Sequence, residues 1–353
     1  MTPAELQALC VPPETTIRQV IACIDKGGQG IALVTDTDRR LIGTITDGDV
    51  RRATLASINL EEPVNKLFAF KANSMYTTPV TAPAGTSVDE LLRTMQEQVV
   101  HQIPLLDAEG RVVDLATWSA LVPDRALDVQ AIVMAGGFGN RLRPLTEELP
   151  KPMLEVGGRP LMERIIEQLQ RTGIRRVHVA THFKPEKIVE HFGDGSDFGV
   201  ELTYVNEDRP LGTAGALGLL PTPDQPLLVI NGDILTQVDF GAMLAFHREH
   251  RAAITMAVRR LELQLAYGLV ECEGATVKRI REKPQLHLLI NAGIYLLEPA
   301  VFPFIPAGEH FNMTELITAV IGADLPVVSF PIHEYWLDIG QHEDYLRAQE
   351  DVR

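Results

Sequence analysis

The segment AIVMAGGFGNRLRPLTEELPKPMLEVGGRPL, residues 131–161, carries the strongest signal in the chain. Apolar residues 131–135 run directly into the glycine-rich residues 136–139. Glycines allow the backbone to turn tightly and to bring N–H groups against phosphate oxygens. A helix that begins near Arg141 would add the positive end of its dipole. The segment therefore predicts a strand that ends in a phosphate-binding loop.

Two common phosphate loops do not fit this segment. A Walker A loop requires G-x-x-x-x-G-K-[ST], which is absent, and a dinucleotide fingerprint requires a third glycine where Leu142 stands. An NAD-dependent oxidoreductase is therefore a weak alternative. Instead, Arg141 and Lys151 follow the glycines closely and supply the local positive charge that a phosphorylated ligand needs.

The whole string, with Arg143-Pro144-Leu145-Thr146 and Pro150-Lys151-Pro152, resembles the signature of the sugar-nucleotidyltransferase family, G-x-G-T-R-L-x-P-L-T…P-K-P. Asn140 stands where that family often has Thr or Ser. The resemblance covers residues 130–350. It implies the transfer of a nucleoside monophosphate from a nucleoside triphosphate to a sugar 1-phosphate, with release of pyrophosphate.

The residues after the loop alternate between strand and helix patterns. Strands are expected at 130–135, 176–180, 201–205, 226–230, 253–258, 268–271 and 291–297, and helices at 161–173 and 184–191. This alternation is typical of an α/β layered domain. Together with the resemblance, it predicts a Rossmann-like nucleotidyltransferase domain with a mixed, mostly parallel sheet over residues 129–353.

The segment NEDRPLGTAGA, residues 206–216, resembles the family's nucleobase segment. Gly212 would let the base lie on bare backbone, Thr213 would offer a hydroxyl, and Glu207 could accept hydrogen bonds from a base edge. The structural alternative is a glycine-rich loop that caps a helix at Thr213. The nucleotide-binding residues that the resemblance implies are Ala135, Gly136, Gly137, Gly139, Glu207, Gly212 and Thr213.

Two aspartates are expected to hold Mg²⁺. The strand pattern at 227–231 leads to Asp233, and a carboxylate at the carboxyl end of such a strand points into the crevice where ligands of open α/β sheets bind. Mg²⁺ favours one or two protein carboxylates together with phosphate oxygens and waters. Trp336-Leu337-Asp338-Ile339-Gly340 resembles the family's W-x-D-x-G, so Asp338 would complete the metal site. An ordinary turn or helix cap is the alternative for either residue alone.

The resemblance also implies a sugar site. Tyr267-Gly268 and Glu282-Lys283-Pro284 look like the family's Y-G and E-K-P elements, and Asn291-Ala292-Gly293 looks like its N-x-G. Lys283 would hold the phosphate of the sugar. The implied sugar-binding residues are Tyr267, Gly268, Glu282 and Asn291, and the implied catalytic residues are Arg141, Lys151, Asp233 and Lys283.

The base and the sugar are open at this stage. The segment Pro210-Leu211-Gly212-Thr213-Ala214-Gly215 looks most like that of guanylyltransferases acting on mannose, heptose or amino-sugar 1-phosphates. GTP therefore ranks ahead of UTP or dTTP. A non-catalytic nucleotide sensor is the alternative from another class. The joint presence of Arg141, Lys151, Asp233 and Asp338 argues against it.

Residues 12–53 and 83–122 form an internal repeat with a period of about seventy residues. Each copy shows a helix pattern followed by two short strands. The tandem resembles a pair of CBS domains (a Bateman module) over residues 1–125, with a linker at 123–129. Such a pair implies a regulatory or dimerising role.

One ligand site of this module looks intact. Residues 43–49, GTITDGD, fit the family's G-h-h-T-x-x-D, so Thr46 and Asp49 would contact an adenine nucleotide. Asp49 as a plain helix cap is the alternative. The second repeat has Thr117-Trp118 at the equivalent place and lacks the T-x-x-D.

The composition limits the kinds of partner, covalent link and location that the protein can have. The chain has 353 residues, a net charge of −15 and only three cysteines, Cys10, Cys23 and Cys272. The negative charge disfavours nucleic acid, and the sparse cysteines disfavour disulfides and zinc. Neither a signal peptide nor a membrane span is expected, so a cytoplasmic protein is predicted. Both resemblances are to families that often self-associate, which favours a homo-oligomer. His247 and His250 are expected on a solvated helix face.

Overall fold

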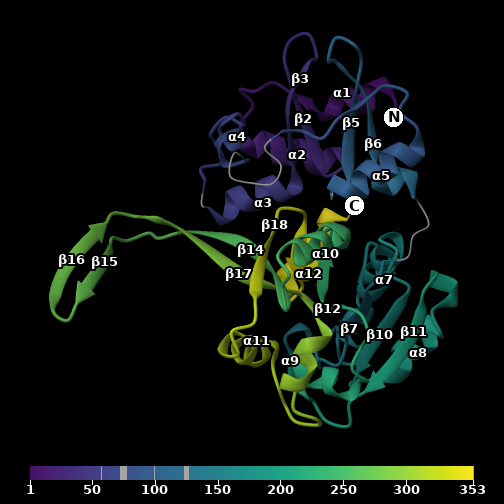
Figure 1. The fold of residues 1–353 in the computed structure, drawn as a ribbon. Helices are drawn as coiled ribbons and strands as arrows, with labels where there is room; N and C mark the ends of the chain where they lie inside the picture. The colour runs from purple at the N-terminus through teal and green to yellow at the C-terminus, as the bar shows by residue number, and fades with distance from the viewer. Residues whose placement is uncertain (57, 72–77, 99, 123–126, 353) are drawn as a thin grey trace. The chain divides into compact units, whose positions relative to one another are not determined.

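The computed structural model describes residues 1–56, 58–71, 78–98, 100–122 and 127–352. The chain divides into two compact units, Met1–Arg125 and Ala126–Arg353. The expected linker at 123–129 spans this division, and its residues 123–126 lie outside the described residues. Figure 1 labels the helices and strands of both units.

The N-terminal unit contains the repeat twice. Each copy has a three-stranded sheet with one parallel and one antiparallel pair, in the order β1-β2-β3 and then β4-β5-β6. The elements of the first copy are α1 (Pro3–Leu9), β1 (Cys10–Val11), α2 (Ile17–Gly27), β2 (Ile31–Thr35), β3 (Leu41–Thr46), α3 (Asp47–Leu55) and α4 (Lys66–Lys71). Those of the second copy are β4 (Ala82–Pro83), α5 (Val88–Gln98), β5 (Gln102–Leu106), β6 (Val112–Thr117) and α6 (Trp118–Leu121).

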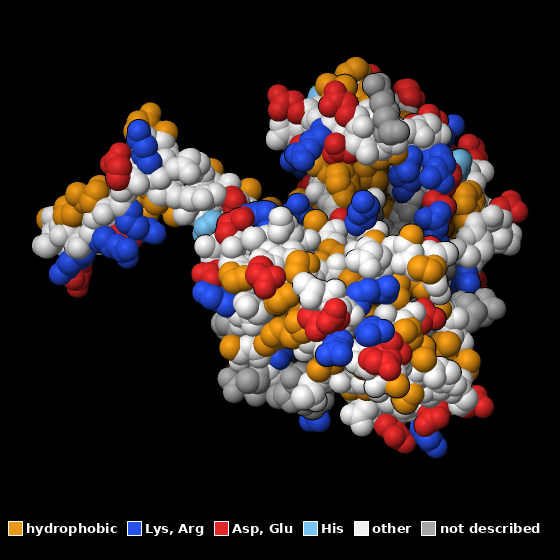
Figure 2. Space-filling view, turned by 90° about the horizontal axis from the view of Figure 1, so that it is seen from above, with side chains coloured by type: hydrophobic (Ala, Val, Ile, Leu, Met, Phe, Trp, Pro, Cys, Tyr) orange, Lys and Arg blue, Asp and Glu red, His pale blue; other side chains and the backbone are white. Residues whose placement is uncertain are grey.

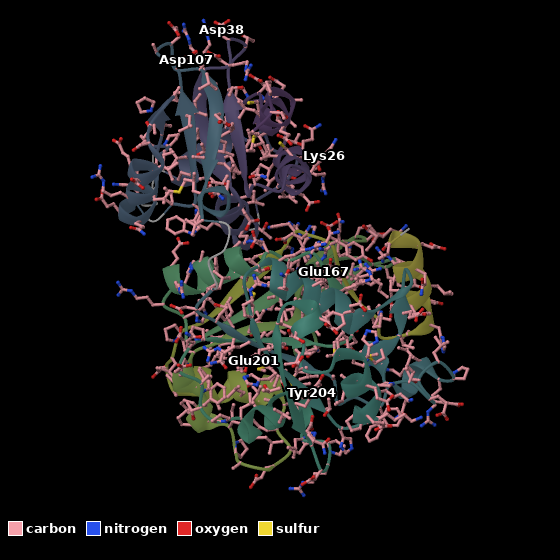
Figure 3. The ribbon with its side chains drawn as sticks, turned by 90° about the vertical axis from the view of Figure 1, so that its right-hand side faces the viewer. Lys26, Asp38, Asp107, Glu167, Glu201 and Tyr204 are labelled. Atoms are coloured by element: carbon pink, nitrogen blue, oxygen red, sulfur yellow. The ribbon has the colours of Figure 1, made fainter. Side chains whose placement is uncertain are left out.

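Equivalent residues of the two copies perform the same structural task. Asp36 and Asp107 each begin the turn between the two long strands, and their carboxylates accept from backbone N–H groups two and four residues later. Figure 3 shows the two turns, marked by Asp38 and Asp107, at the same end of the unit. Thr46 and Thr117 each cap the following helix. The repeat is therefore a repeat of structure as well as of sequence.

The C-terminal unit is built on a seven-stranded sheet in the order β11-β10-β7-β12-β17-β14-β18. The pairs β11–β10, β10–β7, β7–β12 and β14–β18 are parallel, and β17 is antiparallel to both of its neighbours. The expected mixed, mostly parallel sheet is confirmed. The strands are β7 (Gln130–Met134), β10 (Arg176–Thr181), β11 (Glu201–Asn206), β12 (Leu227–Asn231), β14 (Ile254–Gln264), β17 (Gln285–Leu297) and β18 (Val327–Ile332).

Helices cover both faces of this sheet, so its strands are apolar on both sides. Ala131 and Val133 of β7 join one core with α7, α8 and α10, whereas the intervening Ile132 joins a second core with α9 and α11. Alternate strand residues point to opposite faces, which explains this division. The helices are α7 (Leu161–Arg171), α8 (Pro185–Phe192), α9 (Gly212–Gly215), α10 (Phe240–Glu249), α11 (Met313–Gly322) and α12 (His342–Asp351).

The amphipathic pattern of α7 shows how one such helix is held. Its residues Leu161, Met162, Ile165, Ile166 and Leu169 are all buried, at the three- and four-residue spacings that put them on one face. Full burial of each such side chain contributes about 1.5–3 kcal/mol.

Short elements complete the unit. They are η1 (Asn140–Leu142), η2 (Lys151–Met153), β8 (Glu155–Val156), β9 (Arg159–Pro160), η3 (Ser196–Phe198), η4 (Ala216–Leu219), β13 (Ile234–Thr236), β15 (Leu269–Glu273), β16 (Thr276–Arg281), η5 (Pro299–Phe304) and β19 (Trp336–Asp338).

The prediction of a helix that begins near Arg141 is wrong. Only the single 3₁₀ turn η1 forms there, and Arg143 is already extended. The residue before a proline is pushed out of the helical region by the proline ring, and Pro144 follows Arg143. The loop therefore has no helix dipole behind it, and its positive charge comes from side chains.

The strands β14 and β17 run on past the body of the sheet as a two-stranded ribbon, with β15 and β16 at its far end (Figure 1). We call residues 260–290 the arm. In the described residues, no helix is both long and apolar enough to cross a membrane.

The expectation of a solvated His247 is also wrong. Its side chain is buried, and its ring nitrogens contact the Thr255 hydroxyl at 2.7 Å and the Glu298 carboxylate at 3.0 Å. Position 247 lies on the face of α10 that packs on the sheet, beside Met243 and Leu244.

Candidate active site

The glycine-rich loop and Asp233 leave the sheet at the same edge. β7 and β12 are parallel neighbours, with Asn231 opposite Met134, so the chain segments that follow them start side by side. The backbone N–H of Gly232 donates to the Met134 carbonyl at 2.9 Å. The carboxyl edge of a parallel sheet is where open α/β folds bind ligands.

Lys151 and Asp233 form an ion pair at this edge. The Nζ of Lys151 donates to Oδ2 of Asp233, although the two residues are 82 positions apart in the chain. Lys151 is buried, so its charge is poorly screened. The other oxygen of Asp233, Oδ1, is buried and has no hydrogen-bond partner in the described residues. An orphaned, buried carboxylate oxygen is costly unless it binds something else.

Asp338 lies beside this pair. β13 and β19 are antiparallel, with Ile234 opposite Asp338, and the N–H of Ile339 donates to the Asp233 carbonyl at 3.0 Å. Although part of the Asp338 side chain reaches solvent, partial burial and the charge of Asp233 raise its pKa, while the cations Lys151 and Arg141 act in the opposite direction. Arg141 also lies near Gly340, since a Cβ on that glycine would be 3.7 Å from an Arg141 nitrogen.

The residues of this edge fit Mg²⁺. The orphaned Oδ1 of Asp233 is a free carboxylate donor, and Asp338 supplies a second carboxylate. Within the described residues there is no group of three or more His, Cys, Asp or Glu side chains placed to hold a metal. Two carboxylates suit Mg²⁺, which takes its other oxygens from phosphates and water.

The loop itself is shaped by Gly139. This residue has φ +63°, and a Cβ there would lie 2.8 Å from the Thr146 side chain and 3.3 Å from that of Lys151. The Thr146 hydroxyl donates to the Gly139 carbonyl at 2.8 Å. Gly137 lies in open space. Thr146 thus fixes the loop, although the sequence motif that contains Thr146 did not predict a role for it.

Glu207 is placed against the loop. The residue is 5% exposed, and Oε2 accepts from the N–H of Leu211 at 2.8 Å. Its other oxygen would be 2.7 Å from a Cβ on Gly136. Burial raises the pKa of Glu207, while the Leu211 N–H and the charge of His182 lower it. The carboxylate therefore links the two segments that the sequence predicts to bind the nucleotide.

Gly212 and Thr213 are held by the segment before α11. Gly212 has φ +79°, and the Thr213 hydroxyl accepts from the N–H of Met313 at 2.8 Å. Thr213 is inside the short helix α9 and does not act as its N-cap.

Asn291 lies near the same edge through its neighbour Gly293. A Cβ on Gly293 would be 2.6 Å from the Asn231 side chain and 2.8 Å from that of Ile234. Asn291 itself accepts from the Gly293 N–H at 3.0 Å and donates to the Tyr295 hydroxyl at 2.6 Å.

The other expected sugar residues lie on the arm. Tyr267 is 84% exposed, and Glu282 and Lys283 are also exposed. Glu282 lies near Gly268, and Figure 1 shows the ribbon of β14 and β17 leading away from β7 and β12 toward β15 and β16. The structure thus brings together the residues predicted to bind nucleotide and metal. It leaves Tyr267, Gly268, Glu282 and Lys283 apart from them.

Thr46 and Asp49 of the N-terminal unit form a capping box for α3. The carboxylate of Asp49 accepts from the Thr46 N–H and hydroxyl, from Arg52 at 2.8 Å and from Lys71 at 2.7 Å. Burial would raise the pKa of Asp49, but the Lys71 charge, these hydrogen bonds and Arg52 together lower it. Asp49 is buried and its oxygens already have donors, so the adenine-nucleotide role stays a prediction.

An aromatic group beside the loop was missed. The Phe138 ring lies edge-on to His182 at 5.3 Å between centroids and near Phe183 at 5.7 Å. Phe138 is 42% exposed. Its position between two loop glycines is the signal that could have found it.

Comparison with known proteins agrees with this geometry. Residues 130–353 match the family model described as nucleotidyl transferase, and residues 1–56 and 72–122 match that of the CBS domain. The chain is 34% identical over 233 residues to a mannose-1-phosphate guanylyltransferase of Mycobacterium tuberculosis, covering 64% of each chain. It is 35% identical over 228 residues to the mannose-1-phosphate guanyltransferase of Schizosaccharomyces pombe, covering 62% of each.

A solved structure of HddC from Yersinia pseudotuberculosis shares the fold, with a TM-score of 0.50 at 24% identity over 64% of this chain and 100% of that one. The chain spans less than two thirds of the length of the two curated relatives above. The family model itself covers well over half of this chain, including the loop, both aspartates and the arm. The chain therefore belongs to the nucleotidyl transferase family, and its N-terminal unit matches CBS domains.

Proposed function

We propose that this protein transfers a nucleoside monophosphate from a nucleoside triphosphate to a sugar 1-phosphate and releases pyrophosphate. The observation that carries the proposal is the cluster of Arg141, Lys151, Asp233 and Asp338 directly behind the glycine-rich loop. A non-catalytic nucleotide sensor would not need an ion pair with an orphaned carboxylate oxygen at this edge.

The nucleophile in this reaction is a phosphate oxygen of the sugar 1-phosphate. It attacks the α-phosphorus in line as the bond to pyrophosphate breaks. Because this oxygen is already ionised near neutral pH, no general base is required, and the protein acts by positioning and by neutralising charge. The loop N–H groups and Arg141 hold the triphosphate, and Lys151 faces the transferred phosphate.

Asp233 and Asp338 would hold Mg²⁺, which neutralises phosphate charge and orients the reacting oxygens when it is bound. Lys151 donates to Oδ2 of Asp233, so Oδ1 is the oxygen that remains for the metal.

GTP is the proposed nucleotide, and mannose 1-phosphate or a related heptose or glucosamine 1-phosphate is the proposed acceptor. The names of the relatives in Mycobacterium tuberculosis and Schizosaccharomyces pombe favour GTP and mannose 1-phosphate. UTP and dTTP are the alternatives. We further propose a cytoplasmic setting, where all three cysteines stay as free thiols, and use of the product in cell-surface glycans.

Pyrophosphate release tests the proposal. The purified chain with Mg²⁺ would be mixed with GTP, UTP, dTTP, CTP or ATP and a panel of sugar 1-phosphates. Release with GTP and one sugar supports the proposal and identifies the acceptor. Release with UTP or dTTP keeps the reaction and overturns the base. No release with any pair, with or without adenine nucleotides for the N-terminal unit, favours the sensor.

A further inference from the structure

The turn at residues 182–184 contacts both segments that are predicted to bind the nucleotide. This turn joins β10 to α8. In the sheet, β10 lies between β7, which leads into the glycine-rich loop, and β11, which leads to Glu207. All three strands are parallel, so the turn after β10 lies between these two segments at the carboxyl edge of the sheet.

His182 holds the segment that carries Glu207. Its Nδ1 lies 2.6 Å from the backbone carbonyl oxygen of Glu207. A carbonyl oxygen only accepts, so Nδ1 carries a hydrogen and donates it in either charge state of the ring. The N–H of Glu207 donates to the carbonyl of Thr181 at 2.8 Å. Two consecutive residues, Thr181 and His182, therefore hold both backbone groups of Glu207.

The same histidine touches the glycine-rich loop. The rings of His182 and Phe138 meet edge to face, with 5.3 Å between their centroids and 88° between their planes. This arrangement is favourable because the positive edge of one ring meets the negative face of the other. A Cβ on Gly136 would lie 3.4 Å from the Cβ of His182, so the loop backbone also packs against this residue.

The rest of the turn contacts the loop segment at a second place. The centroid of the Phe183 ring lies 5.7 Å from that of Phe138, and Nζ of Lys184 lies 5.6 Å from the Phe183 centroid. This Nζ donates to the Glu147 carbonyl at 2.8 Å and to the Glu148 carboxylate at 2.7 Å. The turn therefore supports the loop segment both at its glycines and after its motif.

Exposure alone does not single out Phe138. Figure 2 shows hydrophobic side chains among Lys and Arg over the arm. Ile280 and Val277 of the arm are 64% and 53% exposed, more than the 42% of Phe138. The distinguishing feature of Phe138 is its contact with the one residue that also holds the Glu207 carbonyl.

We propose that His182 is a positioning residue that couples the placement of Glu207 at the nucleobase to the placement of the glycine-rich loop at the phosphates. This inference rests on the proposed function, from which it takes that one nucleotide contacts both segments. Because the segments are joined through His182, ordering one of them on binding also orders the other. The nucleotide then loses less affinity to ordering than it would with two independent segments.

A double-mutant cycle on GTP binding tests the contact with the loop. Phe138→Ala removes one ring at an exposed position, and His182→Asn keeps an amide donor near the place of Nδ1 and removes the other ring. Titration calorimetry with GTP and Mg²⁺ should show that each change raises Kd by roughly three- to tenfold. The double variant should raise Kd no further than the larger single change, because both remove the same contact. A rise equal to the product of the two single effects overturns the proposal.

His182→Phe tests the contact with the base segment. It keeps a ring against Phe138 and loses the N–H that holds the Glu207 carbonyl. We expect Kd for GTP to rise by roughly three- to tenfold, while Kd for inorganic tripolyphosphate, which has no base, stays at the wild-type value. A residue that only fills space would be replaced well by phenylalanine, so a wild-type Kd for GTP in this variant overturns the proposal.

His178→Asn is the matched control for these variants. His178 is a half-buried histidine of the same strand, and its ring nitrogens contact Gln130 and Thr203. This change should leave Kd for GTP and for tripolyphosphate unaltered. Urea midpoints check that each variant is folded.

Pyrophosphate release separates this inference from the proposed function. Coupled binding in the cycle without release from any substrate pair supports the role of His182 and overturns the proposed reaction. Release together with independent effects in the cycle keeps the reaction and overturns the role of His182. If the wild type binds UTP in place of GTP, the same cycle with UTP decides the role. Failure to bind any common nucleoside triphosphate overturns both.

Discussion

Lys151 and Asp233 meet at the carboxyl edge of the sheet, with the lysine on one carboxylate oxygen and no protein partner on the other. Lys151 is buried, at 7% exposed, and Asp233 is partly buried. Removing one member of such a pair leaves the other charge uncompensated.

We therefore expect Asp233→Asn to reduce turnover by on the order of 10²-fold or more and to weaken its dependence on Mg²⁺. The amide keeps the size of the side chain and loses the charge that both Lys151 and the metal need. Pyrophosphate release as a function of Mg²⁺ concentration measures both effects. Asp324→Asn makes the same chemical change at an exposed residue of positive φ, which Asn also adopts, and should be neutral. Wild-type turnover in Asp233→Asn would remove this residue from the site.

Arg141→Ala should also reduce turnover by on the order of 10²-fold or more. Arg141 is the exposed cation beside Gly340, and no helix dipole reinforces the loop at this point. The triphosphate would lose its main positive contact as pyrophosphate departs. Steady-state kinetics with GTP would separate a fall in kcat from a rise in KM. Arg347→Ala, on the exposed side of α12, is the control, and equal rates in the two variants would contradict the assignment.

Gly212→Ala should lower stability and raise KM for the nucleotide. At φ +79° an added Cβ would lie 2.7 Å from the Phe311 carbonyl, which is backbone and cannot swing away. Gly308→Ala is a close control, because its φ is +67° and nothing lies within 4 Å of its Cβ position. The left-handed conformation alone costs roughly 1–2 kcal/mol in both variants. The urea midpoint should therefore fall further in Gly212→Ala than in Gly308→Ala, and KM for GTP should rise further. Matching values in the two variants would show that the Phe311 contact is unimportant.

The sequence predicted the edge of the sheet better than it predicted the arm. Strand ends and glycine positions are set by local pattern, so the loop, Asp233 and the strands that lead to them could be anticipated. The pairing of Lys151 with Asp233 joins segments 82 positions apart, and only the family resemblance brought them into one site.

Two failures have physical causes. Position 247 appeared polar because His250 and several charged residues surround it, but a buried hydroxyl and a carboxylate satisfy both ring nitrogens. Tyr267 and Lys283 were grouped with Asn291 by motif, whereas the seven-pair ribbon between them fixes their distance.

His247 makes the stability of the protein sensitive to acid. Burial lowers its pKa from the ordinary value of 6.5, although the hydrogen bond and charge of Glu298 act in the opposite direction. The unfolded chain then binds a proton at this residue more readily than the folded chain. The contribution of His247 to stability is therefore complete above about pH 6.5 and is lost as the pH falls through the lowered value.

Urea unfolding at pH 7.5 and pH 5.5 should show a larger loss of unfolding free energy in the wild type than in His247→Gln, which keeps hydrogen-bonding groups and does not titrate. His250→Gln, on the same helix, is the control and should keep the wild-type difference. An identical pH dependence in wild type and His247→Gln would mean that the buried imidazole does not control acid stability.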